Sequence, residues 1–338
     1  MKLATYQDGS RDGQLVVVSR DLSTAHYATG TATRLQQVLD DWNFLSPQLQ
    51  DLYVTLNQGK ARHAFAFEPR QCMAPLPRAS QWAVGSAYPT HLERLQQAAG
   101  RPPPVEADVL RMAQGASDDF LGPCGDAWFG AEAWDIDFEA GLAVISGDVG
   151  MGASPEQALD GVRLLMLANG WALRQFEATE RASGLGPVQC RPAAAFGPVA
   201  LTPDELGPAW QRGRVHLTLQ SACNGRRVGQ TEAGSGMAWH FGQLIAHLAR
   251  TRNLRAGAIV GSGPVSHADP RQGCNALAEL RAIETLETGQ AQTGYLRLGD
   301  KLRIEMLGRD GQSLFGAIDQ RVAGPGQASP DPAGPGET

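Results

Sequence analysis

The segment Asp135–Ser146 begins with alternating polar and apolar residues and ends in an uninterrupted apolar run. This pattern predicts a half-buried strand that enters a hydrophobic core. Further strand-like runs occur at Lys2–Tyr6, Gln14–Val18, Ala258–Val260, Tyr295–Leu298 and Leu302–Met306. Helix-like spacing of apolar residues occurs at Gln36–Trp42, Pro47–Asn57, Pro155–Asn169 and Trp239–Arg252, the third of these after an N-cap at Ser154. We therefore expect an α+β fold that is mostly β, with helices packed outside a sheet-rich body.

The length of 338 residues suits one large or two ordinary domains. Three prolines within residues 68–80 predict a connector, so we expect a small N-terminal domain at 1–75 and a main domain at 76–323. The proline run at Gly100–Pro104 cannot be helical and is expected to form a loop or lid. The Gly/Pro-rich tail at 324–338 is predicted to be disordered.

Composition excludes several classes of protein. A net charge of −6 with scattered basic residues gives no electrostatic footprint for nucleic acid. No apolar run approaches the ~18 residues that a membrane span needs, and the first residues lack the apolar h-region expected of a signal peptide. The five cysteines form no CxxC pair, which favours cytosolic thiols over a disulfide framework or a zinc site. We expect a cytoplasmic protein that binds neither nucleic acid nor membranes.

Four motifs occur along the main body of the chain. They are Asp137-Phe138-Glu139-Ala140, the segments Met151–Ala158 and Gln189–Pro198, and Gly261-Ser262-Gly263 followed by Ala278-Glu279. In their order and separations they resemble the motifs of the fumarylacetoacetate hydrolase family. The main body resembles that family over roughly residues 80–322, and the first 75 residues resemble the small N-terminal domain of its longer members. The resemblance implies a β-roll or barrel-like body with flanking helices and a homodimer. It also implies a Mg²⁺-type site for oxo-acid or 1,3-dicarbonyl substrates.

The sequence departs from the family pattern where the chemistry lies. The metal-binding carboxylates would fall on Glu139, Gly141 and Gly170, of which only Glu139 is a carboxylate. The active-site lysine falls on Arg191, and the chain has only three lysines elsewhere. The threonine of the family's Gly-Ser-Gly-Thr turn falls on Pro264, and a substrate-contacting tyrosine falls on Ala113. The catalytic glutamate and the arginine four residues after the metal aspartate are present as Glu279 and Arg174.

These departures predict a changed site. A hard divalent ion needs several oxygen ligands, so we expect no tight metal site, although weak Mg²⁺ binding at Glu139 stays open. Glycine at positions 141 and 170 predicts a wider cavity. Without its cation, Glu139 should have a raised pKa or should pair with Arg191 or Arg174. Arg191 can bind a substrate carboxylate through two hydrogen bonds.

The candidate catalytic residues are Glu139, Glu279 and His91, and the candidate substrate-binding residues are Arg191, Arg174, Gln114, Ser262, Gly263, His267 and Trp171. Structural alternatives stay open for each main candidate. Glu139 could be a relic acid paired with an arginine, and Arg174 a structural ion-pair partner. Glu279 could serve a helix dipole, His91 could lie on a helix surface, and Trp171 could be a core residue.

Three functions fit these observations. The first is a repurposed, metal-independent enzyme acting on a small carboxylate- or keto-bearing molecule, as a C–C hydrolase or lyase, a hydratase or dehydratase, an isomerase or a cyclase, in a setting such as secondary metabolism. The second is a catalytically silent paralogue that binds a ligand or partner. The third is an ordinary divalent-metal hydrolase with ligands from elsewhere, such as Asp118, Asp119 or Asp137.

Overall fold

The computed structural model describes residues 1–102, 109–184 and 186–326. Its centre is an antiparallel pair of long strands, β9 (Ile136–Ser146) and β10 (Val162–Leu173). Every residue of β9 is buried, because Phe138 and Leu142 belong to one hydrophobic core and Ala143 and Ile145 to another. Alternate residues of a strand face opposite sides of a sheet, so this sheet is covered on both faces. The strand predicted over Asp135–Ser146 is confirmed.

The fold is α+β and mostly sheet, as predicted. The large sheet runs in the order β4 (Phe65–Ala66), β3 (Thr24–Tyr27), β2 (Gln14–Val18), β1 (Lys2–Tyr6), β12 (Ala200–Leu201), β10, β9, β17 (Ile259–Gly261), β5 (Trp82–Gly85) and β6 (Met112–Gln114). From it branch β11 (Ala194–Phe196), which pairs with β10, and β7 (Phe120–Leu121), which pairs with β11. The second sheet runs in the order β16 (Arg226–Glu232), β15 (Thr218–Cys223), β18 (Lys301–Met306), β19 (Ile318–Ala323) and β8 (Ala127–Trp128). A short hairpin joins β13 (Trp210–Gln211) to β14 (Arg214–Val215).

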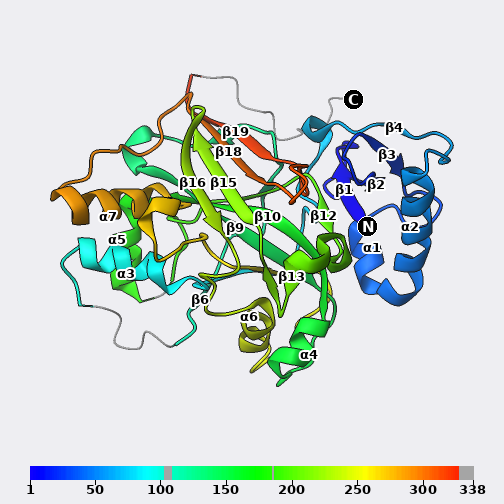
Figure 1. The fold of residues 1–338 in the computed structure, drawn as a ribbon, viewed down its shortest axis with the longest axis horizontal. Helices are drawn as coiled ribbons and strands as arrows, with labels where there is room; N and C mark the ends of the chain where they lie inside the picture. The colour runs from blue at the N-terminus through cyan, green and yellow to red at the C-terminus, as the bar shows by residue number, and fades with distance from the viewer. Residues whose placement is uncertain (103–108, 185, 327–338) are drawn as a thin grey trace, which may run out of the picture.

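The helices lie at the two ends and along one side of the sheets (Figure 1). At the N-terminal end, α1 (Leu35–Asp40) and α2 (Trp42–Asn57) accompany β1–β4. At the opposite end are α3 (Pro89–Ala98), α5 (Arg174–Ser183) and α7 (Leu277–Thr288), and along one side lie α4 (Pro155–Asp160) and α6 (Phe241–Leu248). Short 3-10 turns occur at Pro69–Gln71, Glu132–Trp134, Pro203–Ala209 and Pro270–Gln272. Because β1 pairs with β12, the N-terminal strands continue the central sheet.

The helix predicted over Pro155–Asn169 is wrong beyond its first turns. Ser154 caps the helix as predicted, with its hydroxyl accepting the Gln157 N–H, but α4 ends at Asp160 and strand β10 follows. A run of apolar residues buried on both faces satisfies a helical pattern as easily as a strand pattern. The positions aligned with the family's Asn-Asp pair, Asn169 and Gly170, therefore lie within a strand rather than after a helix.

Smaller differences concern the ends of elements. The helix predicted at Trp239–Arg252 is shorter, and the one predicted to start at Pro47 begins at Trp42. Tyr295–Leu298 is not a strand, because only an isolated bridge joins Leu296 to Ile136. Residues 327–338 of the predicted tail and residues 103 and 104 of the predicted loop or lid lie outside the described residues. The described part of the latter, Gly100 to Pro102, follows α3 and is not helical. Within the described ranges, no helix is long and apolar enough to cross a membrane.

Candidate active site

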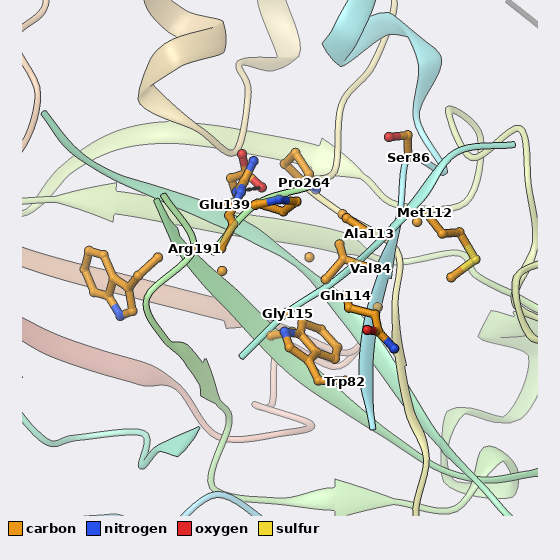
Figure 2. A pocket seen from close by; sticks show the side chains of 18 of the residues that line it. Trp82, Val84, Ser86, Met112, Ala113, Gln114, Gly115, Glu139, Arg191 and Pro264 are labelled. Atoms are coloured by element: carbon orange, nitrogen blue, oxygen red, sulfur yellow. Dashed lines mark ion pairs between the residues drawn. The ribbon is translucent and has the colours of Figure 1, made fainter. Parts of the chain in front are cut away.

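A cavity of about 210 Å³ lies among β5, β6, β9, β10 and β17, beside helices α3 and α5 (Figure 2). Much of its wall is apolar, including Trp82, Val84, Leu92, Leu95, Met112 and Pro264. Charged and polar side chains reach it from separate elements, and these include His91 on α3, Glu139 on β9, Arg174 on α5 and Arg191 after α5. An apolar cavity with a few convergent polar groups is the usual form of a small-molecule site.

Glu139 lies between two arginines at the polar end of this cavity. Its Oε1 accepts a hydrogen bond from Nη2 of Arg174 at 2.7 Å, and its Oε2 lies 2.5 Å from Nη1 of Arg191. Glu139 is only 8% exposed. Burial raises the pKa of this carboxyl, but Arg191 and Arg174 together outweigh burial, so that the pKa lies well below its usual range. Of the two predicted outcomes, the ion pair is present and the raised pKa is not.

Arg174 is held on several sides by carboxylates. Its Nε donates to Asp137 at 2.9 Å and its Nη1 donates to Glu177 at 3.0 Å, in addition to the bond with Glu139. Both carboxylate oxygens of Asp137 also accept backbone N–H groups at the start of α7, from Leu277 and Ala278. The guanidinium therefore ties α5 to β9 and, through Asp137, to α7. This geometry favours the structural interpretation of Arg174.

Arg191 is the more accessible arginine, with 27% of its side chain exposed. It follows a segment that Glu180 holds through three backbone N–H groups, those of Val188, Gln189 and Cys190, at 3.0, 2.6 and 3.1 Å. Glu180 on α5 thus fixes the backbone immediately before Arg191. An accessible guanidinium in a partly apolar cavity is a suitable binding group for a carboxylate.

His91 and Glu279 form a buried pair beside the cavity. Nδ1 of His91 lies 2.8 Å from Oε2 of Glu279, and Glu279 also accepts hydrogen bonds from Arg94 at 2.7 Å and from Ser266 at 2.6 Å. Burial raises the pKa of Glu279, but these hydrogen bonds, with that of His91 first, lower it below its ordinary value. A carboxylate can only accept, so Nδ1 of His91 carries a proton in this contact, and Nε2 is the ring nitrogen left to exchange a proton with a ligand.

This pair resolves two structural alternatives. His91 is 6% exposed, so it does not lie on a helix surface. Glu279 is in the first turn of α7, but it is fully buried and bonded to side chains rather than acting only on the helix dipole. Glu279 does not line the cavity, whereas His91 does. Any contact of this pair with a ligand is therefore made by His91.

The two glycines that the resemblance aligns with metal-binding carboxylates, Gly141 and Gly170, differ in their surroundings. A Cβ on Gly141 would run into the backbone carbonyl oxygen of Gly263. The turn that carries this carbonyl is held to β9. The backbone N–H of Ser262, directly after β17, donates to the carbonyl of Leu142, and the N–H of Leu142 donates to the hydroxyl of Ser262. A Cβ on Gly170 would meet only Glu139, at 3.8 Å. The predicted widening of the cavity is therefore wrong at Gly141, where backbone fills the space, and holds only at Gly170.

The residues at this place do not supply the donor set of a hard divalent ion. Glu139 is the one carboxylate that the resemblance places at a metal position, and both of its oxygens face arginines. Asp137 is occupied by Arg174 and by backbone N–H groups, and Asp118 and Asp119 are exposed and do not line the cavity. Among the described residues, no group of three or more His, Cys, Asp or Glu side chains could hold a metal.

The remaining predicted site residues separate into two groups. Gln114, Gly263 and Trp171 line the cavity, with the buried indole N–H of Trp171 donating to Gln320 at 3.2 Å. Ser262 and His267 do not line it. Ser262 supports the turn, and Nδ1 of His267 accepts the backbone N–H of Asp269.

Two contributors were missed by the sequence reasoning. Trp82 lines the cavity from β5, and nothing local in the sequence indicates it. Arg94 could have been found, because it follows His91 by three residues and so shares its helix face.

Two protein-family models together match nearly all of the chain up to residue 323. Residues 1–78 match the family described as fumarylacetoacetase N-terminal domain 2, and residues 80–323 match the family described as fumarylacetoacetate hydrolase C-terminal. The chain belongs to the fumarylacetoacetate hydrolase family. A comparison with curated protein sequences finds no match.

Solved structures of this family share the fold across nearly the full chain. A putative HpcE protein from Mycobacterium smegmatis has a TM-score of 0.65 at 18% identity, covering 96% of this chain and 100% of that one. Maleylpyruvate hydrolase from Sphingobium sp. SYK-6, solved with manganese(II) and pyruvate, has a TM-score of 0.63 at 16% identity, with 96% and 99% covered. Fumarylacetoacetate hydrolase from Exiguobacterium antarcticum also has a TM-score of 0.63 at 16% identity, covering 96% of this chain and 99% of that one. At these identities the likeness establishes the fold alone.

Proposed function

We propose that this chain is a metal-independent enzyme that moves a proton next to the carbonyl group of a small carboxylate-bearing substrate. The observation that carries the proposal is that His91, backed by buried Glu279, lines the same cavity as the accessible guanidinium of Arg191. The first group is a positioned base and the second is a positioned cation. Together they are what proton abstraction beside a carbonyl requires.

Each residue has a separate part in the proposed reaction. Arg191 binds the substrate carboxylate or the enolate oxygen that forms when the proton leaves. Nε2 of His91 takes the proton from the carbon next to the carbonyl, and Glu279 stabilises the imidazolium through Nδ1–H. Returning the proton to a different carbon completes an isomerisation. Several structurally similar proteins are isomerases by name, among them a probable 2-hydroxyhepta-2,4-diene-1,7-dioate isomerase from Mycobacterium abscessus.

Metal independence in this proposal is supported by the contacts of Glu139. The family resemblance implies that this residue is a metal ligand, but in this chain its two oxygens pair with Arg174 and Arg191. The low pKa of Glu139 also makes it a poor proton carrier near neutral pH, which leaves His91 as the base. A homodimer and a cytoplasmic location remain predictions.

Solvent exchange tests the proposal without knowledge of the natural substrate. The protein is incubated with 2-oxobutanoate in D₂O, and loss of the proton signal next to the carbonyl is followed by NMR. We expect exchange that EDTA leaves unchanged and that H91Q lowers by roughly 10²–10⁴-fold. The matched control is H247Q, a histidine on α6 that does not line this cavity.

The other two functions predict different results. A silent paralogue shows 2-oxo acid binding that depends on Arg191, but no exchange above buffer. A metal enzyme loses exchange in EDTA and regains it when Mn²⁺ or Mg²⁺ is added. Either result overturns the proposal.

A further inference from the structure

Trp82 closes the apolar end of the cavity. Figure 2 shows Trp82 and Gly115 at one end of the cavity and Glu139 and Pro264 at the other. Val84 and Ala113 lie between the two ends. A ligand whose carboxylate meets Arg191 therefore directs its remaining atoms along apolar side chains toward the indole ring.

The indole is held firmly in this position. A Cβ on Gly115 or on Gly261 would collide with opposite parts of the ring, so the ring fits only because both residues are glycine. The ring also packs against Phe196 in a T-shaped arrangement, with ring centroids 5.2 Å apart and an interplanar angle of 83°. Trp82 is 5% exposed. Core side chains packed in this way do not swing aside to admit a longer ligand without cost.

We propose that Trp82 sets the maximum length of the apolar part of the substrate. The substrate class is then a 2-oxo carboxylate with a short unbranched or planar apolar body that ends against the indole. This inference rests on the proposed function, because it takes Arg191 as the anchor of the carboxylate. It adds a specificity-determining residue that touches the end of the ligand away from the reacting atoms.

The experiment measures binding of a homologous series, from 2-oxobutanoate to 2-oxododecanoate, by calorimetry. Each added methylene should raise affinity about fourfold until the chain reaches Trp82, after which affinity should fall. An aromatic side chain buries roughly 150–250 Å² and a methylene about 30 Å². Since part of the ring faces protein, W82A should move the affinity maximum by about two to four methylenes.

Three further variants make the result decisive. W82F keeps an aromatic ring against Phe196 and should give a smaller shift in the same direction, which guards against misfolding of W82A. W128A removes an exposed tryptophan that does not line the cavity and should leave the series unchanged. R191Q should weaken every member of the series by a similar factor.

The outcomes separate the two claims. If no member binds, or if R191Q binds as wild type does, the proposed function fails and this inference fails with it. If binding depends on Arg191 but the length dependence is the same in wild type, W82A and W82F, the role of Trp82 alone is wrong.

Discussion

Replacing Glu139 by Gln tests whether the Glu139 ion pairs stabilise the fold. The substitution keeps the shape of the side chain but removes the charge that faces Arg174 and Arg191. Arg174 keeps Asp137 and Glu177 as partners, whereas Arg191 loses its ion-pair partner in the cavity and can turn partly to solvent. The loss should therefore be at the lower end of that measured for breaking a buried ion pair, about 3 kcal/mol.

The expected shift in melting temperature follows from chain length. The entropy of unfolding is about 2.1 cal/mol/K per residue. For a chain of 338 residues, a loss of about 3 kcal/mol in unfolding free energy therefore lowers the melting temperature by about 4 °C. R191M should lower the unfolding free energy by less, about 1–2 kcal/mol, because Glu139 keeps its ion pair with Arg174. The loss in the double variant E139Q/R191M should be smaller than the sum of the two single losses, and the coupling energy should be about 1–3 kcal/mol.

The pH dependence of E139Q has a defined sign. The pKa of Glu139 is depressed in the folded state, so its contribution to stability is fully present above the unfolded value of about 4.3. It is lost as pH falls from there through the folded pKa. Thermal unfolding followed by circular dichroism should therefore show a gap between wild type and E139Q that is constant near pH 7 and shrinks below about pH 4. A gap under 1 °C at pH 7, or one that grows in acid, would refute the reasoning.

Further substitutions address the glycines, the segment before Arg191 and the histidine pair. G141E should destabilise the fold by at least about 2 kcal/mol because it overpacks against a backbone carbonyl, whereas G170D should fold normally by circular dichroism. Neither variant should bind Mn²⁺ tightly in an EPR titration, and a micromolar site in G170D would contradict the geometry. E180Q should weaken 2-oxo acid binding about tenfold with little change in melting temperature, because Glu180 orders the backbone of the arginine segment. E284Q is its matched control, since Glu284 accepts similar backbone hydrogen bonds and does not line the cavity, and equal effects of the two would refute the prediction. R94M should lower proton exchange about tenfold at unchanged 2-oxo acid affinity, and an affinity loss alone would count against a positioning role.

The sequence predicts well those elements whose pattern is local. Strand β9 is recognisable from its alternation and apolar run, and the start of α4 is recognisable from Ser154 and Pro155. Strand β10 is not, because a strand buried on both faces has no alternation to reveal it. The sequence does not distinguish a helix from a strand where both faces are buried, because no polar residues then alternate with the apolar ones.

The site shows the same division between local and long-range information. The resemblance identified Glu139, Glu279, Arg174 and Arg191 as positions of interest, and the structure brings Glu139 and the two arginines into contact. The bond between His91 and Glu279 joins residues 188 positions apart, and no local pattern records it. The obstruction at Gly141 also depends on a distant segment, since the blocking atom belongs to the backbone of Gly263.

These contacts explain why the departures from the family pattern belong together. A carboxylate side chain cannot enter at Gly141 unless the turn at Gly263 moves, and that turn is bonded to β9. The space beside Gly170 is next to Glu139, and Oε2 of Glu139 pairs with Arg191. Arginine is abundant in this chain and could have replaced lysine at position 191 by drift alone. A change at position 191 alone does not account for the carbonyl of Gly263 that blocks position 141, or for the glycine beside Glu139. The geometry is that of a site organised around two paired arginines, and a carboxylate added at either glycine alone would leave both oxygens of Glu139 paired with arginines.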